Sequence, residues 1–229
     1  MQTSEGTCCI SALYEDLLRR IFLENTFPLD IYRLINVSRY NPQPIKQIRP
    51  LTTARHCSQV SRHWRSIFLS TPSIWARLID LDGFRQATDD WMKQVMARSG
   101  DALLWVYGRL VSDMHDLSFS FLGENWRRVQ MLVIRVDNQN YLRLTSRFGE
   151  HKMWNFLEKS APHLQWINVC LLIESMKYMP GGRLFGDNAP LLRDFSISAS
   201  RFRTDASWLP NLSSMTAESP CILRIAIFA

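Results

Sequence analysis

The amino-acid sequence predicts an α+β protein whose first part is helical and whose second part is built from repeated strands. Apolar residues recur at helical spacing in residues 13 to 24 and again in residues 52 to 70. Beyond Gly100 the spacing changes to the alternation that is typical of strands, and the segment 156–169 is repeated at an offset of 28 residues. With 229 residues, of which 46% are hydrophobic, the chain can bury a substantial core.

The chain is modestly basic, and its cysteine content favours a reducing compartment. The net charge is +6, and most of the excess is N-terminal, because residues 1 to 80 hold 10 Lys and Arg against 6 Asp and Glu. Five cysteines, an odd number, and no signal-peptide pattern at the start argue against a disulfide framework. The chain contains no run of about 18 apolar residues, which is the pattern that would predict a membrane span. We therefore expect a cytoplasmic or nuclear protein.

The first helix is expected in "LYEDLLRRIFLE", residues 13 to 24, after a disordered tail at residues 1 to 9. One wide apolar face combines Leu13, Leu17 and Ile21 with Leu18 and Phe22. The pairs Glu15 with Arg19 and Asp16 with Arg20 have the favourable i,i+4 order. Residues 27 to 50 hold four of the ten prolines and are expected to form a loop or insertion.

The helical pattern resumes in "LTTARHCSQVSRHWRSIFLSTP", residues 51 to 72. Thr52 or Thr53 is the expected N-cap, and Pro72 should end the helix. One side of this single predicted helix carries the apolar residues Ala54, Cys57, Val60, Trp64, Ile67 and Phe68. A third short element is expected around Ile74, Trp75 and Leu78, and a linker helix within residues 81 to 100, capped by Gly100.

Strands are expected in "ALLWVYGRL", "VQMLVIRV" and "WINVCLL". In the repeated segments, "FLEKSAPHLQWINV" at 156–169 aligns without a gap on "LFGDNAPLLRDFSI" at 184–197. The shared core, leucine followed by alternating apolar residues, is typical of a leucine-rich repeat. Degenerate copies begin at Val129 and Leu212, so the spacings are 35, 28 and 20, and the glycine-bearing stretch 179–190 is expected to be a tight turn between repeats.

The two helical segments together resemble an F-box, and the whole chain resembles the F-box proteins of mushroom-forming fungi. "LYEDLLRRIF" stands where the family has L-P-x-E-(L/I)-L-x-x-I-F, and "VSRHWRSIFLSTPSIW" matches V-C-(R/K)-x-W-R-x-(I/L)-x-x-(S/T)-T-P-x-L-W. Two positions depart from the pattern. Tyr14 replaces the helix-starting proline, which weakens the N-terminal cap, and Ser61 replaces the usual cysteine, which removes a small apolar contact.

The resemblance implies a three-helix F-box module at residues 10 to 80 and an irregular leucine-rich-repeat-like α/β solenoid at 101 to 229. It implies the substrate-recognition subunit of a ubiquitin ligase, which binds a Skp-type adaptor, and through it a cullin, and captures a protein substrate with the repeats. The adaptor-binding residues would be Leu13, Leu17, Leu18, Ile21, Phe22, Val60, Trp64, Ile67 and Pro72.

The sequence also bears on functions other than adaptor binding. Periodicity alone predicts that Trp64 and the apolar residues on its side of the helix lie in an internal core. The match at both F-box halves favours instead a surface that binds a partner. A repeat-based scaffold without ligase coupling is the alternative. His56, Cys57 and His63 lack a fourth zinc ligand, the basic helix face lacks a nucleic-acid motif, and no catalytic or cofactor motif is present. Three tryptophans, Trp105, Trp166 and Trp208, are candidates for substrate contact.

The substrate cannot be named from the sequence, because repeat surfaces vary over one backbone plan. The chain ends in the apolar stretch "CILRIAIFA", whereas a solenoid needs a polar terminal cap, so a truncated C-terminus is expected.

Overall fold

The structure, a computed structural model, describes residues 13–27, 50–81, 90–110, 115–136, 155–171, 183–197 and 205–216. Helices and a six-stranded parallel sheet make a mixed α+β fold, which confirms the predicted class. The expected tail at 1 to 9, most of the expected insertion and the apolar C-terminal stretch lie outside the described residues.

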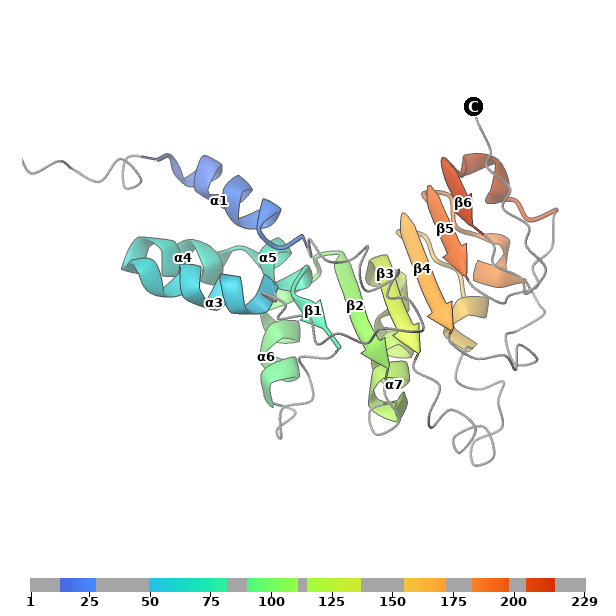
Figure 1. Cartoon of the computed structure of the whole chain (residues 1–229), viewed down its shortest axis with the longest axis horizontal. Coiled ribbons are helices and arrows are strands. Elements are labelled where there is room, and N and C mark those ends of the chain that lie inside the picture. The colour runs from blue at the N-terminus through green and yellow to red at the C-terminus, as the bar shows by residue number, and fades with distance from the viewer. Residues whose placement is uncertain are drawn as a thin grey trace, which may run out of the picture.

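Four helices lie together at one end of the molecule: α1 (Glu15–Glu24), α3 (Pro50–Val60), α4 (Arg62–Ser70) and α5 (Pro72–Ala76) (Figure 1). Their shared core contains Phe22 of α1, whose ring lies 4.9 Å from that of Trp64 and 4.4 Å from that of Phe68. Because such pairs add roughly 0.5 to 1.5 kcal/mol to the free energy of area burial, these contacts fix α1 against α4.

The prediction of one helix over residues 52 to 70 is wrong, because the chain breaks at Ser61. This residue has extended backbone angles, φ −155° and ψ 164°, and its hydroxyl accepts a hydrogen bond from the backbone N–H of Trp64 at 3.1 Å. A serine at this position satisfies one of the free N–H groups of the next helix. Ser61 therefore ends α3 and caps α4, so that the two helices can pack against each other.

In the remaining elements, strands alternate with helices and short 3₁₀ turns. They are β1 (Ile79–Asp80), α6 (Asp90–Ser99), β2 (Leu104–Leu110), α7 (His115–Asn125), the 3₁₀ turn η4 (Trp126–Arg128), β3 (Val129–Val136), η6 (Asn155–Glu158), β4 (Trp166–Leu171), η8 (Leu184–Asp187), β5 (Asp194–Ile197), η9 (Leu209–Asn211) and β6 (Ser214–Thr216). The predicted glycine cap of α6 is confirmed, since Gly100 has a φ of 48°.

The sheet places its strands in chain order from β1 to β6, and every neighbouring pair is parallel (Figure 1). Alternate residues of each strand face opposite sides. One side joins the main core through residues such as Val106, Leu132 and Ile167, whereas the other side, named here the outer face, carries a separate cluster of Tyr107, Met131 and Val133.

The sequence repeat corresponds to a repeated local structure. Before β4, the N–H of Leu164 donates to the carbonyl of Ala161 at 3.3 Å, and before β5 that of Leu192 donates to Ala189 at 3.2 Å. The expected later copy has the same turn, because the N–H of Leu212 donates to the carbonyl of Leu209 at 3.2 Å. All three leucines are buried, so each turn delivers one leucine to the core just before a strand begins.

Aromatic rings connect successive turns beneath the sheet. The ring of Trp126 lies 4.9 Å from Phe156 and 6.3 Å from Phe185, and Phe185 in turn lies 5.4 Å from Trp208. All four side chains are buried. The suggestion that Trp208 contacts a substrate is therefore wrong, because its ring is part of this core.

The expected turn before β5 is a tight left-handed segment. Phe185, Gly186 and Asp187 have φ values of 58°, 55° and 58°. This conformation costs little for glycine and more for other residues. A Cβ atom at Gly186 would also lie 3.2 Å from the carbonyl oxygen of Glu158, so both backbone angle and space favour glycine there.

Replacement of Ser61 by alanine tests the break between α3 and α4. We expect Ser61→Ala to lower the free energy of unfolding by about 1 kcal/mol, because the N-terminal N–H groups of α4 lose their acceptor. Chemical unfolding followed by circular dichroism measures this value. Ser66→Ala, at an exposed position inside α4, is the control and should be neutral or slightly stabilising. Equal stabilities of the two variants would contradict the assigned cap.

Two glycine substitutions test the left-handed turn. Gly186→Ala should destabilise the chain by about 1 kcal/mol or more, because alanine is strained at positive φ and meets the carbonyl of Glu158. Gly123→Ala lies in α7 with no atom within 4 Å of the new Cβ, so it should stabilise by about 0.5 to 1 kcal/mol. Thermal unfolding of both variants gives the comparison, and effects of the same sign would be inconsistent with this turn.

Candidate protein-interaction surfaces

Helix α1 presents an apolar stripe to solvent. Tyr14, Leu17 and Ile21 follow one another at spacings of three and four residues and are 86%, 46% and 38% exposed. Val60, at the end of α3, is 61% exposed. The first turn of α1 and the junction of α3 with α4 lie at the same end of the molecule, away from the sheet (Figure 1). We call these four residues the apolar docking surface.

The nine predicted adaptor-binding residues divide into three groups. Leu17, Ile21, Val60 and Pro72 are exposed, and Leu13 and Trp64 are half-buried against the core. Leu18, Phe22 and Ile67 are almost completely buried. The prediction is corrected for these last three, because contacts within the helical core already occupy their side chains. Sequence periodicity merged the two sides of α1 into one wide face and could not separate them.

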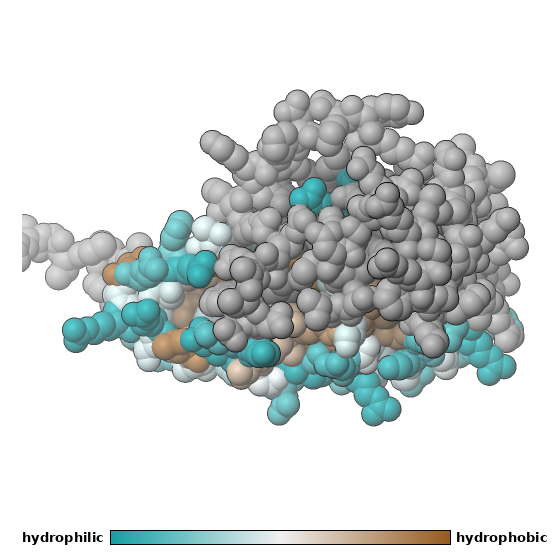
Figure 2. All heavy atoms as spheres, turned by 90° about the horizontal axis from the view of Figure 1, so that it is seen from below, coloured by the Kyte–Doolittle hydropathy of each residue, from teal (hydrophilic) through white to brown (hydrophobic). Residues whose placement is uncertain are grey.

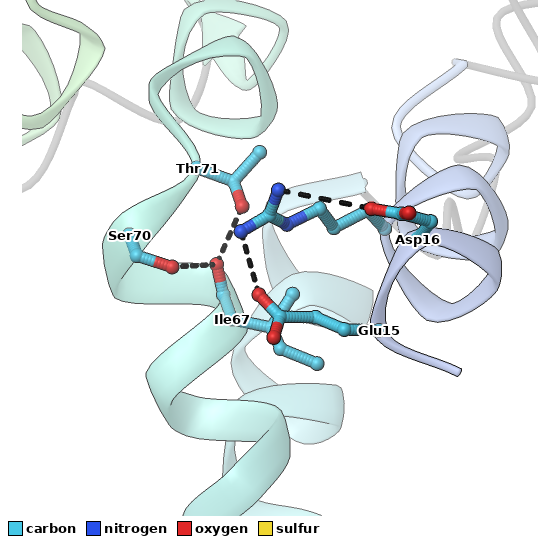
Figure 3. A network of polar contacts seen from close by, with 6 residues as sticks. Glu15, Asp16, Ile67, Ser70 and Thr71 are labelled. Atoms are coloured by element: carbon cyan, nitrogen blue, oxygen red, sulfur yellow. Dashed lines mark hydrogen bonds and ion pairs between the residues drawn. The ribbon is translucent and has the colours of Figure 1, made fainter. Parts of the chain in front are cut away.

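Pro72 belongs to a polar junction between α4 and α5. It is the first residue of α5, where its missing N–H costs nothing. Figure 3 shows the carbonyl oxygen of Ile67 accepting hydrogen bonds from the hydroxyls of Ser70, at 3.3 Å, and Thr71, at 2.7 Å. The indole N–H of Trp75 donates to the carbonyl of Phe68 at 2.6 Å. These bonds satisfy carbonyls at the end of α4 and fix the turn into α5.

Acidic side chains in the first turn of α1 are paired within that helix. Arg19 Nη2 lies 2.6 Å from Glu15 Oε1, as expected from the sequence. Asp16 pairs with Arg19 Nη1 at 4.0 Å instead of with Arg20 (Figure 3). All these groups are well exposed, so each ion pair contributes little to stability, but both carboxylates are held beside their own helix.

The two departures from the F-box pattern act on the backbone. Tyr14 occupies the N-cap of α1 without a side-chain capping bond, and its φ of −63° is the value to which proline is restricted. Ser61 supplies the cap of α4 described above. The sequence predicted only that Ser61 loses an apolar contact. The structure adds that its hydroxyl gains a backbone partner.

A second surface forms where the helical end meets the outer face of the sheet. Trp105 lies between two side chains of the helical region: the guanidinium of Arg77 is 4.1 Å from the centre of its ring, and the ring of Phe27 is 5.8 Å away, edge-on. Phe27 also lies 6.4 Å from Trp166 on β4, with the two rings nearly parallel. We call Phe27, Arg77, Trp105 and Trp166 the aromatic joint.

The position of Arg77 in the aromatic joint changes the pKa of its guanidinium. Burial of half of this group lowers the pKa of the guanidinium, and the nearby negative charge of Glu24 opposes that change. An arginine in this setting is stabilised by the face of Trp105, because the ring quadrupole attracts a cation. Phe27 and Arg77 could not be identified from the sequence, since neither lies on a motif and their partners are distant in sequence.

Trp105 and Trp166 keep part of their surface exposed, in contrast to Trp208. The register places Trp105 opposite Met131, Met131 opposite Trp166, and Trp166 opposite Asp194, whose carboxylate accepts a hydrogen bond of 2.5 Å from Ser214. Across this row the outer face changes from aromatic to polar.

Metal-binding clusters are not found in the described ranges. No group of three or more His, Cys, Asp or Glu side chains there could hold a metal ion. Cys57 is half-buried, and burial raises the pKa of its thiol, which disfavours the reactive thiolate. Among the same residues, no helix is both long and apolar enough to cross a membrane.

Comparison with known proteins finds no matching family model, no matching curated protein and no matching solved structure.

Replacement of Phe27 tests the aromatic joint. Phe27→Ala removes the ring between Trp105 and Trp166, and we expect it to lower the free energy of unfolding by about 1 to 3 kcal/mol. Acrylamide should also quench tryptophan fluorescence more strongly. The control is Tyr14→Ala, which removes a highly exposed aromatic ring and should change stability by less than about 0.5 kcal/mol. Similar stabilities of the two variants would argue against the joint.

Proposed function

We propose that this chain is the substrate-recognition subunit of a Skp-cullin-F-box ubiquitin ligase. In this proposal the helices α1, α3, α4 and α5 form the F-box module, and the strands with their turns form a leucine-rich-repeat-like solenoid. The module binds the Skp adaptor, and the solenoid holds the protein substrate. The chain contributes proximity between substrate and ligase and no chemistry of its own.

The observation that carries the proposal is the apolar docking surface. Leu17, Ile21 and Val60 are large apolar side chains left in solvent by a helical module whose own core is complete without them. An exposed apolar stripe such as the one that Leu17 and Ile21 form on α1 marks an interaction site. They fall at positions of the F-box pattern that was identified in the sequence, so the sequence and the exposure favour the same surface.

Repeated local structure supports the second half of the proposal. The leucine turns before β4, β5 and β6 and the parallel, sequential strands suit a solenoid, in which successive units stack. The half-exposed Trp105 and Trp166 lie on the outer face and are the best candidates for substrate contact, because aromatic residues dominate protein interfaces. The same features suit a scaffold that is not coupled to a ligase, and the adaptor experiment distinguishes the two functions.

Adaptor binding by an exposed-residue double variant tests this function. We expect the full chain to bind a Skp adaptor and Leu17→Ala with Ile21→Ala to weaken binding at least tenfold. Each of these side chains contributes on the order of 1.5 to 3 kcal/mol if docking buries it fully, before association costs. Isothermal titration calorimetry with purified adaptor measures the affinity, and circular dichroism checks that the variant remains folded.

Leu191→Ala provides the matched control, since this leucine is 40% exposed but lies in the repeat region. It should bind the adaptor as the unmodified chain does. Failure of the unmodified chain to bind any Skp adaptor would overturn the ligase function and leave the scaffold. Unchanged binding by the double variant would show that the adaptor uses a different surface.

A further inference from the structure

The charges of α3, α4 and α5, beside the part of the apolar docking surface that Val60 forms, have a single sign, whereas α1 carries charges of both signs. Residues 50 to 76, which form α3, α4 and α5, contain three arginines and two histidines but no aspartate or glutamate. Arg62 and Arg65 on α4 are exposed, as are His56 and His63. The chain as a whole has 27 basic against 21 acidic residues, so the one-sided charge is a local property.

The positions of these charges are fixed by local structure. Arg62 follows Val60 by two residues, and the cap made by Ser61 sets the direction in which α4 begins. Arg65 lies one turn further along the same side of α4. Figure 2 shows hydrophilic side chains bordering hydrophobic ones over the helical end of the molecule. Arg62 thus lies close to Val60 in the chain, and both residues are exposed.

The two acidic groups in the first turn of α1 are paired within their own helix and not with this basic flank. Glu15 and Asp16 both pair with Arg19 of their own helix, at 2.6 Å and 4.0 Å. A partner that covers Val60 would therefore meet the positive charges of Arg62 and Arg65. Acidic side chains on the partner would match this pattern, whereas basic ones would be repelled.

We propose that this surface selects its partner by charge, and that the occupant is an amphipathic helix with an apolar side and acidic flanks. The apolar side would cover Leu17, Ile21 and Val60, and the acidic flank would face Arg62 and Arg65. This inference rests on the proposed function, because it assigns the helix to the Skp adaptor. Nucleic acid is disfavoured, since four large apolar side chains would then be covered by phosphates and sugars.

The rate of association with the adaptor tests the inference. For the full chain and purified Skp adaptor, stopped-flow fluorescence should show the association rate falling about tenfold or more between 50 and 500 mM NaCl, because salt screens the steering charges. Arg62→Glu with Arg65→Glu should lower the rate at least about tenfold at the lower salt concentration and change the dissociation rate much less.

A charge reversal elsewhere serves as the control. Lys93→Glu changes an exposed lysine on α6 and should alter the association rate less than about twofold. Circular dichroism verifies that each variant is folded. Adaptor binding that ignores salt and the double reversal would overturn the charge selection and leave the proposed function intact. Absence of adaptor binding by the unmodified chain, or its replacement by binding to an RNA or DNA oligonucleotide, would overturn both.

Discussion

Helix α1 has apolar residues on two sides, and the neighbouring helices cover only one of them. Leu18 and Phe22 are buried against α4, so the side that carries Tyr14, Leu17 and Ile21 remains in solvent. The apolar stripe of α1 is wider than the part that its neighbours α4 and α5 cover. The other functional features follow from this placement, because it presents the exposed stripe along α1 and brings Phe27, which follows the helix, to the sheet.

The aromatic joint links the two halves of the chain. Phe27 follows α1 and Arg77 follows α5, and both contact Trp105 on β2. The docking surface and the outer face are thus connected by one short helix and one aromatic cluster. A substrate held near Trp105 or Trp166 would have a defined orientation relative to a protein bound at Leu17 and Ile21. This geometry suits a receptor that works by proximity, and it requires no reactive group.

Much of the fold follows from local patterns in the sequence. The ends of α1, the cap at Gly100, strands β2 to β4 and the turns at Leu164 and Leu192 could be predicted because alternation, capping residues and repetition act over a few residues. The break at Ser61 was missed because apolar periodicity continues across it. Burial of Leu18, Phe22 and Trp208, and the contacts of Phe27 and Arg77, depend on neighbours distant in sequence, which periodicity cannot identify.

The central claim is that the exposed side of α1 and the end of α3 form a protein-binding surface for a Skp adaptor. Hydroxyl-radical footprinting of the full chain, alone and with the adaptor, measures the solvent access of individual side chains. We expect oxidation of Tyr14, Leu17, Ile21 and Val60 to fall on binding while that of Leu191 stays the same. Adaptor binding that leaves these four side chains as reactive as before would contradict the account.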